Sequence, residues 1–469
     1  MIEGSAIATK IVCTIGPASQ SRDVLGRMIA AGMDVARINF AHGDFQSHAE
    51  TIAAVRDSAR SAGRRVAILG DLPGPKLRIG ALAEQPVELE QGQAFALAVG
   101  DFEGDAHRAS TTFEGLPKAV RTGDTIFLND GMIQLEVREI AGGEVRCNVA
   151  VGGPLLSHKG INVPDADLGI SAFTGRDREC LAFAAAQGLD AVSQSFVQHG
   201  EDIEAVRGAA WDLSYRPMIF AKIERSRALA EIDRILEAAD GIMVARGDLG
   251  VEIPIERIAI AQKELIGKAN LLCKPVITAT QMLLSMVDNR RPTRAEVTDV
   301  ANAILDGTDC VMLSEESAIG THPVDAVAML AKIARATEPQ VAPRSGAHWL
   351  GRAGSNIELV ASSVAAIAQK APPLGILVPT KRGTTPRRIA AFRLPVLVTA
   401  VSRSEKTCQE LVFSYGVHAL HEPERSGSWQ DFARRHFGAQ ARPGAKVLLT
   451  EGTPGVEIDG TNRLEIIDL

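Results

Sequence analysis

Aromatic residues, paired cysteines and long apolar runs are scarce or absent in this sequence. Phe, Trp and Tyr make up 4% of its 469 residues, whereas hydrophobic residues make up 46%, a composition typical of a soluble globular chain. The six cysteines form no CxxC pair, which argues against a zinc site or a disulfide framework. No apolar run approaches the roughly 20 residues of a membrane-spanning helix, and the N-terminus lacks a signal-peptide pattern. We therefore expect a cytoplasmic protein with no membrane partner.

Charge and length limit the classes of partner and fold. The formal net charge of −7 disfavours nucleic acid as a partner, so an anionic ligand must be held by a local cationic cluster. At roughly 100–200 residues per domain, the length predicts two to four domains.

Short β-rich apolar runs alternate with helical segments along much of the chain. This order predicts parallel βαβ units closed into a (β/α)8 TIM barrel, with the active site at the C-terminal ends of the strands. The eight predicted strands are KIVCTIG from Lys10, DVARINF from Asp34, VAILGDL from Val66, AVSQSF from Ala191, PMIFAKIE from Pro217, GIMVARGD from Gly241, PVITAT from Pro275 and DCVMLS from Asp309.

Two regions break the alternation. β-like pieces and glycine turns fill the chain from about Pro73 to Pro164, which predicts an inserted β-barrel lid domain over the active face. After about Pro339, a second strand and helix pattern predicts a C-terminal open-sheet α/β domain. We assign residues 1–72 and 165–340 to the catalytic barrel, 73–164 to the lid and 341–469 to the C-terminal regulatory domain.

Polar side chains collect at the ends of the predicted barrel strands. Arg37 and Asn39 share one face of DVARINF, because side chains two apart in a strand point the same way. Lys222 and Glu224 do the same in MIFAKIE, although this pair alone would equally fit a structural ion pair. Glu224 and Asp248 end adjacent strands and form a pair of hard oxygen ligands suited to magnesium.

Hydroxyl groups follow the last two predicted strands, Thr280 in ITATQ and Ser314 in MLSEES. Each could cap a helix, but beside the lysine, arginine and carboxylates they indicate substrate hydrogen bonds or a proton relay. The residues therefore predict a magnesium-dependent barrel enzyme that acts on a small phosphorylated, carboxylate-bearing molecule. The reaction classes left open are phosphoryl transfer and enolate chemistry of the aldolase or lyase kind.

Long motifs of the chain resemble those of the pyruvate kinase family. LNDGMIQLEV and KGINVP resemble the lid of that family, and the tail resembles its allosteric domain more loosely. The resemblance implies a cytoplasmic homotetramer that transfers the phosphoryl group of phosphoenolpyruvate to ADP, giving pyruvate and ATP. The motifs run collinearly from Thr9 to about Val327 and are TKIVCTIGPAS, GMDVARINFAHG, KIE, DGIMVARGDLGVEIP, KPVITATQMLLSM, RPTRAEVTDVANAILDGTDCVMLSEESA and HPVDAV.

The resemblance also implies roles for the matching residues at the reacting groups. Arg37 and Lys222 would hold the transferring phosphoryl group, and Lys222 would also offset charge on the enolate oxygen. Glu224 and Asp248 would ligate Mg²⁺, or Mn²⁺ in its place.

The resemblance also implies residues for the substrate carboxylate, for proton transfer and for the nucleotide. The backbone amides of Gly247 and Asp248, with the Thr280 hydroxyl, would bind the substrate carboxylate. Thr280 and Ser314 would relay a proton to the enolate through water. The nucleotide would be bound by Asn39, His42, Arg78, Asp130 and Lys159.

Departures from the family pattern concern potassium. Potassium-dependent members surround the ion with two hydroxyls, an asparagine and an aspartate. Here the asparagine and aspartate are Asn39 and Asp71, but Ala41 and Leu72 replace the hydroxyl residues. Lys76 stands where the family often has glutamate, and lysine there is associated with potassium independence. We expect that potassium is not required and that Lys76 replaces it.

Two further departures lie near the predicted active face. Glu315 replaces the usual glycine, where it would either tune substrate affinity or point outwards. Gln198 and His199 stand where basic residues are common.

The C-terminal domain carries PTKRGTTPRR between a predicted strand and helix. It resembles the phosphate-binding loop of the family's effector site and would take a sugar phosphate or nucleoside monophosphate, although a basic helix start without a ligand remains an alternative. The predicted contacts are Thr380, Lys381, Gly383, Thr384 and Thr385.

Two other functions compete with phosphoryl transfer. An aldolase or lyase on the same fold would need no nucleotide lid, yet Arg78, Asp130 and Lys159 are present. A paralogue that only senses phosphoenolpyruvate or an effector is disfavoured by the intact Lys222 and Glu224.

Overall fold

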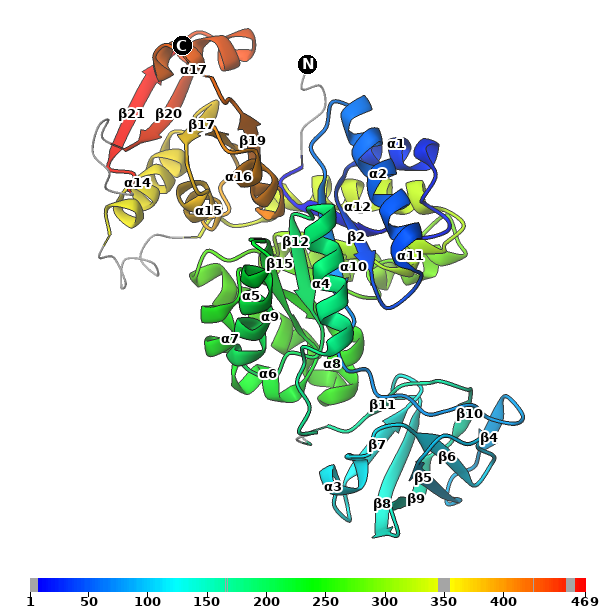
Figure 1. Ribbon diagram of the computed structural model, residues 1–469. Helices are drawn as coiled ribbons and strands as arrows, with labels where there is room; N and C mark the ends of the chain where they lie inside the picture. Colours follow the sequence, from blue (N-terminus) through cyan, green and yellow to red (C-terminus); the bar gives the residue numbers. More distant parts are fainter. Residues whose placement is uncertain (1–6, 165, 167, 345–354, 425, 453–459) are drawn as a thin grey trace.

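The computed structural model describes residues 7–164, 166, 168–344, 355–424, 426–452 and 460–469. Figure 1 shows a central barrel, a lid of sheets that stands away from one end of it, and a C-terminal α/β domain at the other end. The loop predicted to open the C-terminal domain lies partly outside the described residues, at 345–354.

Eight strands form a closed parallel barrel in the order β1-β16-β15-β14-β13-β12-β3-β2, which confirms the predicted TIM fold. Each predicted run supplies one strand. The strands are β1 (Lys10–Thr14), β2 (Met33–Asn39), β3 (Ala67–Leu72), β12 (Ala191–Gln194), β13 (Met218–Ile223), β14 (Gly241–Ala245), β15 (Val276–Ala279) and β16 (Cys310–Leu313).

Helices surround this barrel, and local sequence sets several of their ends. Thr174 and Thr293 make capping boxes at the starts of α4 and α10, and Gly188 and Gly307 end these helices in the left-handed region. The barrel helices are α1 (Arg22–Ala31), α2 (Phe45–Ser61), α4 (Gly175–Gln187), α5 (Gly200–Asp212), α6 (Ser226–Ala230), α7 (Ile232–Ala238), α8 (Arg246–Glu252), α9 (Ile258–Leu271), α10 (Arg294–Asp306), α11 (Glu315–Ala318) and α12 (Pro323–Thr337).

The lid is inserted between β3 and β12 and has its own aliphatic core. A six-stranded sheet, β11-β7-β8-β9-β5-β6, accompanies the two-stranded sheet β10-β4. Its elements are β4 (Val87–Leu89), β5 (Ala94–Val99), β6 (Arg108–Thr111), α3 (Leu116–Ala119), β7 (Thr125–Leu128), β8 (Ile133–Ala141), β9 (Glu144–Val151), β10 (Gly153–Leu155) and β11 (Ile161–Asn162).

The C-terminal domain is an open five-stranded sheet in the order β19-β18-β17-β20-β21, with β21 antiparallel to β20. The sequence predicted its strands but not helix α17. Its elements are α14 (Asn356–Lys370), β17 (Gly375–Pro379), α15 (Thr384–Ala390), β18 (Val398–Ser402), α16 (Glu405–Glu410), β19 (Val417–His421), α17 (Trp429–Phe437), β20 (Lys446–Glu451) and β21 (Arg463–Asp468).

The C-terminal domain closes the end of the barrel opposite the lid. Phe413 belongs to the apolar cluster inside the barrel, and its ring lies 5.0 Å from that of Phe220 on β13. Arg393 reaches from the C-terminal domain to Asp309, just before β16, with 3.0 Å between Nη2 and Oδ2. Both side chains are buried, so this ion pair fixes one domain against the other.

We expect Arg393→Leu to lower the free energy of unfolding by about 3 kcal/mol, because it leaves the Asp309 carboxylate buried without its cation. Urea unfolding followed by circular dichroism measures this loss. Arg335→Leu, at an exposed position of α12, is the matched control and should change little. An unchanged midpoint for Arg393→Leu would mean that the pair adds nothing to the domain contact.

Candidate active site

The side chains predicted to carry chemistry lie at the C-terminal ends of the barrel strands, on the side of the lid. Asp71, at the end of β3, is the centre of a buried group. Its carboxylate accepts hydrogen bonds from Arg37 Nε at 3.0 Å and from Ser193 Oγ at 2.6 Å. Lys222 Nζ lies 3.4 Å from the same carboxylate. Burial disfavours ionisation, but Lys222 and Arg37 outweigh it and hold the pKa of Asp71 below its usual range.

Lys222 connects this group to the predicted metal ligands. Its ammonium donates to Ser195 Oγ at 2.7 Å and lies 2.8 Å from Glu224 Oε1. Burial alone would lower the pKa of Lys222, but Asp71 and Glu224 together raise it above its ordinary value, so the side chain is a fixed cation. The ion-pair alternative considered for Lys222 and Glu224 is thus present, within a larger network.

Glu224 and Asp248 are two acidic side chains close enough for their charges to interact, and each has a lysine nearby. Burial and the nearby Asp248 carboxylate raise the pKa of Glu224, although Lys222 acts against them. Lys76 Nζ lies 3.7 Å from Asp248 Oδ1, so Lys76 stands beside the predicted metal ligands. Within the described residues, no group of three or more His, Cys, Asp or Glu is arranged to hold a metal ion. Two carboxylates suit magnesium, which takes further oxygens from water and substrate.

Gly247 and Thr280, two of the residues predicted to bind the substrate carboxylate, lie in contact. Gly247 N–H donates to Thr280 Oγ1 at 2.8 Å, and Thr280 has a φ of +64°, which a β-branched residue rarely adopts. Arg246 holds this conformation, because its Nη2 donates to the Thr280 carbonyl at 2.8 Å and its Nη1 to Asp299 at 2.6 Å. These contacts make Arg246 a positioning residue for Thr280.

Ser314 is placed by a buried carboxylate that the sequence did not single out for this task. Glu316 accepts from Ser314 N–H at 2.7 Å and from Leu283 N–H at 3.0 Å, which links the loops after β15 and β16. Glu315 is exposed to solvent, so its charge stands outside this buried group.

The predicted nucleotide residues fall in two places. Arg78 and Lys159 lie on paired segments of the lid, where Ile79 N–H donates to the Lys159 carbonyl at 3.0 Å. Asp130 is exposed in the turn between β7 and β8. Asn39 ends β2, and His42 follows in an exposed loop of the barrel. These residues therefore lie in two domains and do not form one cluster.

The predicted effector loop joins β17 to α15. Thr380 Oγ1 accepts from Gly383 N–H at 2.9 Å, and Gly383 has a φ of +78°, which glycine adopts without strain. Thr385 is buried and shares a 2.6 Å hydrogen bond with Thr461. The loop is thus folded tightly on itself, with Lys381 and Thr384 exposed.

Ser193 is the residue of the buried group that sequence reasoning missed. In the AVSQSF run, the sequence alone suggests only Ser195, either as a pocket-wall hydroxyl or as a packing residue. A signal was available, since Ser193 lies two residues before Ser195 in the same run, and side chains two apart in an extended segment point the same way. Thr14 was missed as well, although its hydroxyl accepts from Arg37 at 2.8 Å.

In the described part of the chain, no helix has the length and apolarity needed to cross a membrane.

Comparison with known proteins covers nearly the whole chain. The family model "Pyruvate kinase, barrel domain" matches residues 6–327, and "Pyruvate kinase, alpha/beta domain" matches residues 358–467. The chain is 48% identical over 467 residues to the pyruvate kinase of Thermococcus litoralis, covering 98% of both chains. It is 41% identical over 470 residues to that of Geobacillus stearothermophilus, covering 98% of this chain and 80% of that one. For the pyruvate kinase of Thermotoga maritima the identity is 37%, over 98% and 99% of the two chains.

Proposed function

The chain belongs to the pyruvate kinase family of phosphotransferases, and on this basis we propose that it transfers the phosphoryl group of phosphoenolpyruvate to ADP, the final step of glycolysis. One structural observation carries the proposal: Lys222 is held at the end of the barrel by Asp71, Ser195 and Glu224. A buried cation beside a pair of carboxylates suits a substrate whose phosphoryl group leaves an enolate behind.

Arg37 and Lys222 bind and orient the transferring phosphoryl group. Because Asp71 and neighbouring hydroxyls already fix both cations, little reorganisation is needed when charge develops. The bond between phosphorus and the enol oxygen breaks, and a bond from phosphorus to a terminal oxygen of ADP forms. Lys222 offsets the charge left on the enol oxygen.

Glu224 and Asp248 are the residues that would hold Mg²⁺, or Mn²⁺ in its place. The fit rests on the raised pKa of Glu224, since a divalent cation would offset the repulsion between the two carboxylates. Bound there, the metal would supply Lewis-acid stabilisation of negative oxygen. The carboxylates themselves place it next to Lys222.

The remaining residues hold the carboxylate and return a proton. The amides of Gly247 and Asp248 and the Thr280 hydroxyl orient the substrate carboxylate, supported by Arg246. A proton reaches the methylene carbon of the enolate through water held by Thr280 and Ser314, which completes pyruvate.

The lid supplies the second side of the nucleotide site. Arg78, Lys159 and Asp130 bind ADP from the lid, while Asn39 and His42 bind it from the barrel. Contact between the lid and the barrel supports this arrangement. Asn162 Nδ2 donates to Glu252 Oε1 of α8 at 3.4 Å.

The proposal extends to the assembly of the protein and to its regulation. A homotetramer and an effector site follow from the family alone. The folded loop at Thr380, Lys381, Gly383, Thr384 and Thr385 supports a site for a sugar phosphate or nucleoside monophosphate.

A coupled assay tests the function directly. Phosphoenolpyruvate, ADP and magnesium are mixed with the protein, and pyruvate and ATP are measured separately. Equal amounts of both products are expected. Pyruvate without ATP would contradict phosphoryl transfer and favour a lyase or phosphatase, and neither product would favour a sensor.

Removing one metal ligand should weaken the use of magnesium. We expect Glu224→Gln to raise the magnesium concentration for half-maximal rate at least tenfold, because the amide lacks the charge that attracts the cation. Initial rates over a magnesium titration measure the change. Glu256→Gln, an exposed change near α9, is the matched control, and equal titration curves for both variants would exclude Glu224 as a ligand.

A further inference from the structure

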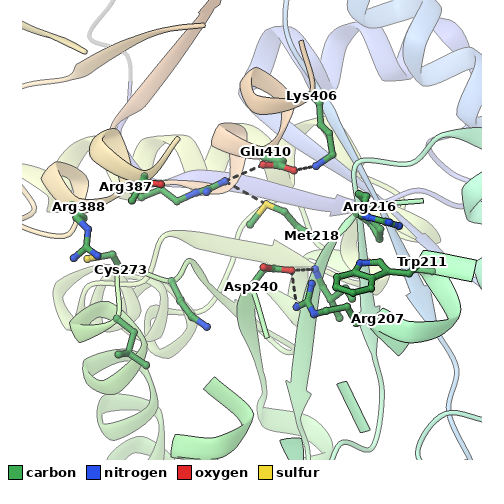
Figure 2. A pocket seen from close by; sticks show the side chains of 16 residues that line it. Arg207, Trp211, Arg216, Met218, Asp240, Cys273, Arg387, Arg388, Lys406 and Glu410 are labelled. Carbon is green, nitrogen blue, oxygen red and sulfur yellow. Dashed lines mark hydrogen bonds and ion pairs between the residues drawn. The ribbon is translucent and has the colours of Figure 1, made fainter. Parts of the chain in front are cut away.

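A cavity of about 420 Å³ lies between the N-terminal end of the barrel and the C-terminal domain (Figure 2). Arg207 and Trp211 of α5 and Arg216, just before β13, form its barrel wall. Arg387 of α15 and Lys406 of α16 form its opposite wall. The cavity is far from the site above along β13, which begins here with Met218 and carries Lys222 at its other end.

Positive charge dominates this cavity, although the whole chain is negative. Two carboxylates, Asp240 and Glu410, also line the cavity, and each already forms ion pairs with cations of its wall. Glu410 lies 3.5 Å from Arg387 and also pairs with Lys406, while Asp240 lies 3.2 Å from Arg207. These two acids leave a large excess of positive charge. The cationic side chains are Arg207, Arg216, Lys274, Arg387, Arg388 and Lys406.

Part of the hydrogen-bonding capacity in this cluster is unused. Arg387 Nε and Arg388 Nε are buried and have no partner in the described part of the chain. Buried donors without acceptors are costly, and cations held close together repel. Lys274 differs, because its ammonium donates to the Ala239 carbonyl at 2.6 Å and to other carbonyls at the end of α7. Arg388 also pairs with Glu358, at 2.8 Å between Nη1 and Oε1. Arg216 and the unpartnered Nε of Arg387 are therefore the groups best placed to bind an anion.

The position of the cations defines the ligand. Guanidinium groups bind phosphate oxygens in pairs, and here they line both walls of a cavity that is open to solvent on one side. One phosphate group would leave one wall without a partner, whereas two phosphate groups would contact both. The cavity is also too small for nucleic acid.

We propose that this cavity is a binding site for a small molecule that carries two phosphate groups and bridges the barrel and the C-terminal domain. It lies beside the loop predicted as the effector site and shares only Thr384 with it. The proposal does not depend on the reaction proposed above, because binding is measured here without substrate or turnover.

Inorganic pyrophosphate is the test probe, with orthophosphate for comparison, in buffer containing EDTA. Trp211 reports on the cavity, since its exposed ring carries the Arg216 guanidinium 4.9 Å above it. Replacing Trp349, which lies outside the described residues, and Trp429 by phenylalanine leaves Trp211 as the single fluorophore. Pyrophosphate should change its emission and bind at least tenfold more tightly than orthophosphate.

Substitutions on each wall locate the site. We expect Arg216→Gln and Arg387→Gln each to weaken pyrophosphate binding about tenfold, by loss of a charge-assisted contact. Lys381→Gln in the neighbouring loop and Arg335→Gln on α12 are the controls and should bind like the parent. Arg387→Gln also removes one of the two cations that pair with Glu410 and could therefore lower stability. If this variant folds poorly, the Arg216→Gln variant, at an exposed position, provides the test of binding.

Three results would overturn the proposal. The first is no change in Trp211 emission and no rise in thermal midpoint with pyrophosphate. The second is equal affinity for orthophosphate and pyrophosphate, which would describe a site for one phosphate. The third is binding that Lys381→Gln removes and Arg216→Gln does not, which would place the anion in the loop.

Discussion

Lys222→Met is expected to lower kcat for pyruvate formation by at least about a hundredfold, and up to about a thousandfold. A single preorganised donor at a developing negative charge is commonly worth this much. The structure gives the reason, because Lys222 contacts Asp71, Ser195 and Glu224 together. Methionine retains much of the volume and removes the charge. The measurement is the initial rate at saturating phosphoenolpyruvate, ADP and magnesium.

The matched control is Lys268→Met. Lys268 is half-exposed and pairs with Asp233 on the barrel surface, so its loss should leave kcat within about twofold of the parent. Circular dichroism and thermal midpoints exclude unfolding, since Asp71 keeps Arg37 as a partner when Lys222 is replaced. A Lys222→Met enzyme that retained the parent rate would remove Lys222 from the chemistry.

The fold was predictable because the signals for the barrel are local. Each strand is a short apolar run, and caps such as Thr293 and Gly307 define the helices between them. Helix α17 was missed since its nine residues include only a few apolar ones, of which Phe432 and Phe437 are buried. The position of Phe413 inside the barrel could not be predicted either, because no local sequence pattern indicates which distant residue packs into the end of a barrel.

The candidate site shows a similar division. Spacing by two residues grouped Lys222 with Glu224 correctly, because both are attached to one strand end. It could not show that the Asp71 carboxylate contacts Arg37, Ser193 and Lys222. These three residues come from three different strands, and only the closure of the barrel brings those strands together around Asp71. The sequence therefore identified the residues of the candidate site better than the contacts between them. The catalytic and binding roles of these residues stay predictions.

Potassium independence depends on this crowded aspartate. In the resemblance, Asn39 and Asp71 are the remaining potassium ligands, with Ala41 and Leu72 in place of hydroxyl residues. The Asp71 carboxylate already accepts from Arg37 and Ser193 and contacts Lys222, and Leu72 is fully buried in the apolar core. A monovalent ion would have to compete with fixed cations for one carboxylate, which supports weak binding.

We predict that Lys76 supplies the compensating positive charge, from the lid side of the site. Its ammonium lies near Asp248 and not at Asp71, the predicted potassium ligand. Lys76 would therefore act on the phosphates and the metal as a nearby positive charge, without occupying the position of the potassium ion. At 35% exposure its side chain is free to shift when substrates bind. The prediction therefore concerns charge in the site, and a charge-removing substitution tests it.

The parent enzyme should keep its rate within about twofold when tetramethylammonium replaces potassium as the counterion. Lys76→Gln should lose about a hundredfold of that rate, because the phosphate-rich centre loses a cation. Added potassium should not restore it, since Ala41 and Leu72 offer no oxygen ligand. Lys268→Gln is the control of equal charge change and should behave like the parent.

Restoring the oxygen ligands should create the potassium requirement that we predict the natural sequence to lack. In the variant Ala41→Ser, Leu72→Thr, Lys76→Glu, the rate should depend on potassium, because two hydroxyls and a carboxylate replace the internal ammonium. Because Leu72 is buried, its replacement could destabilise the protein, so the thermal midpoint of the triple variant must be measured first. A strict potassium requirement in the parent would refute the assignment of Lys76, and potassium rescue of Lys76→Gln would mean that Asn39 and Asp71 suffice to hold the ion. Either result would separate the charge of Lys76 from the loss of the hydroxyls as the cause.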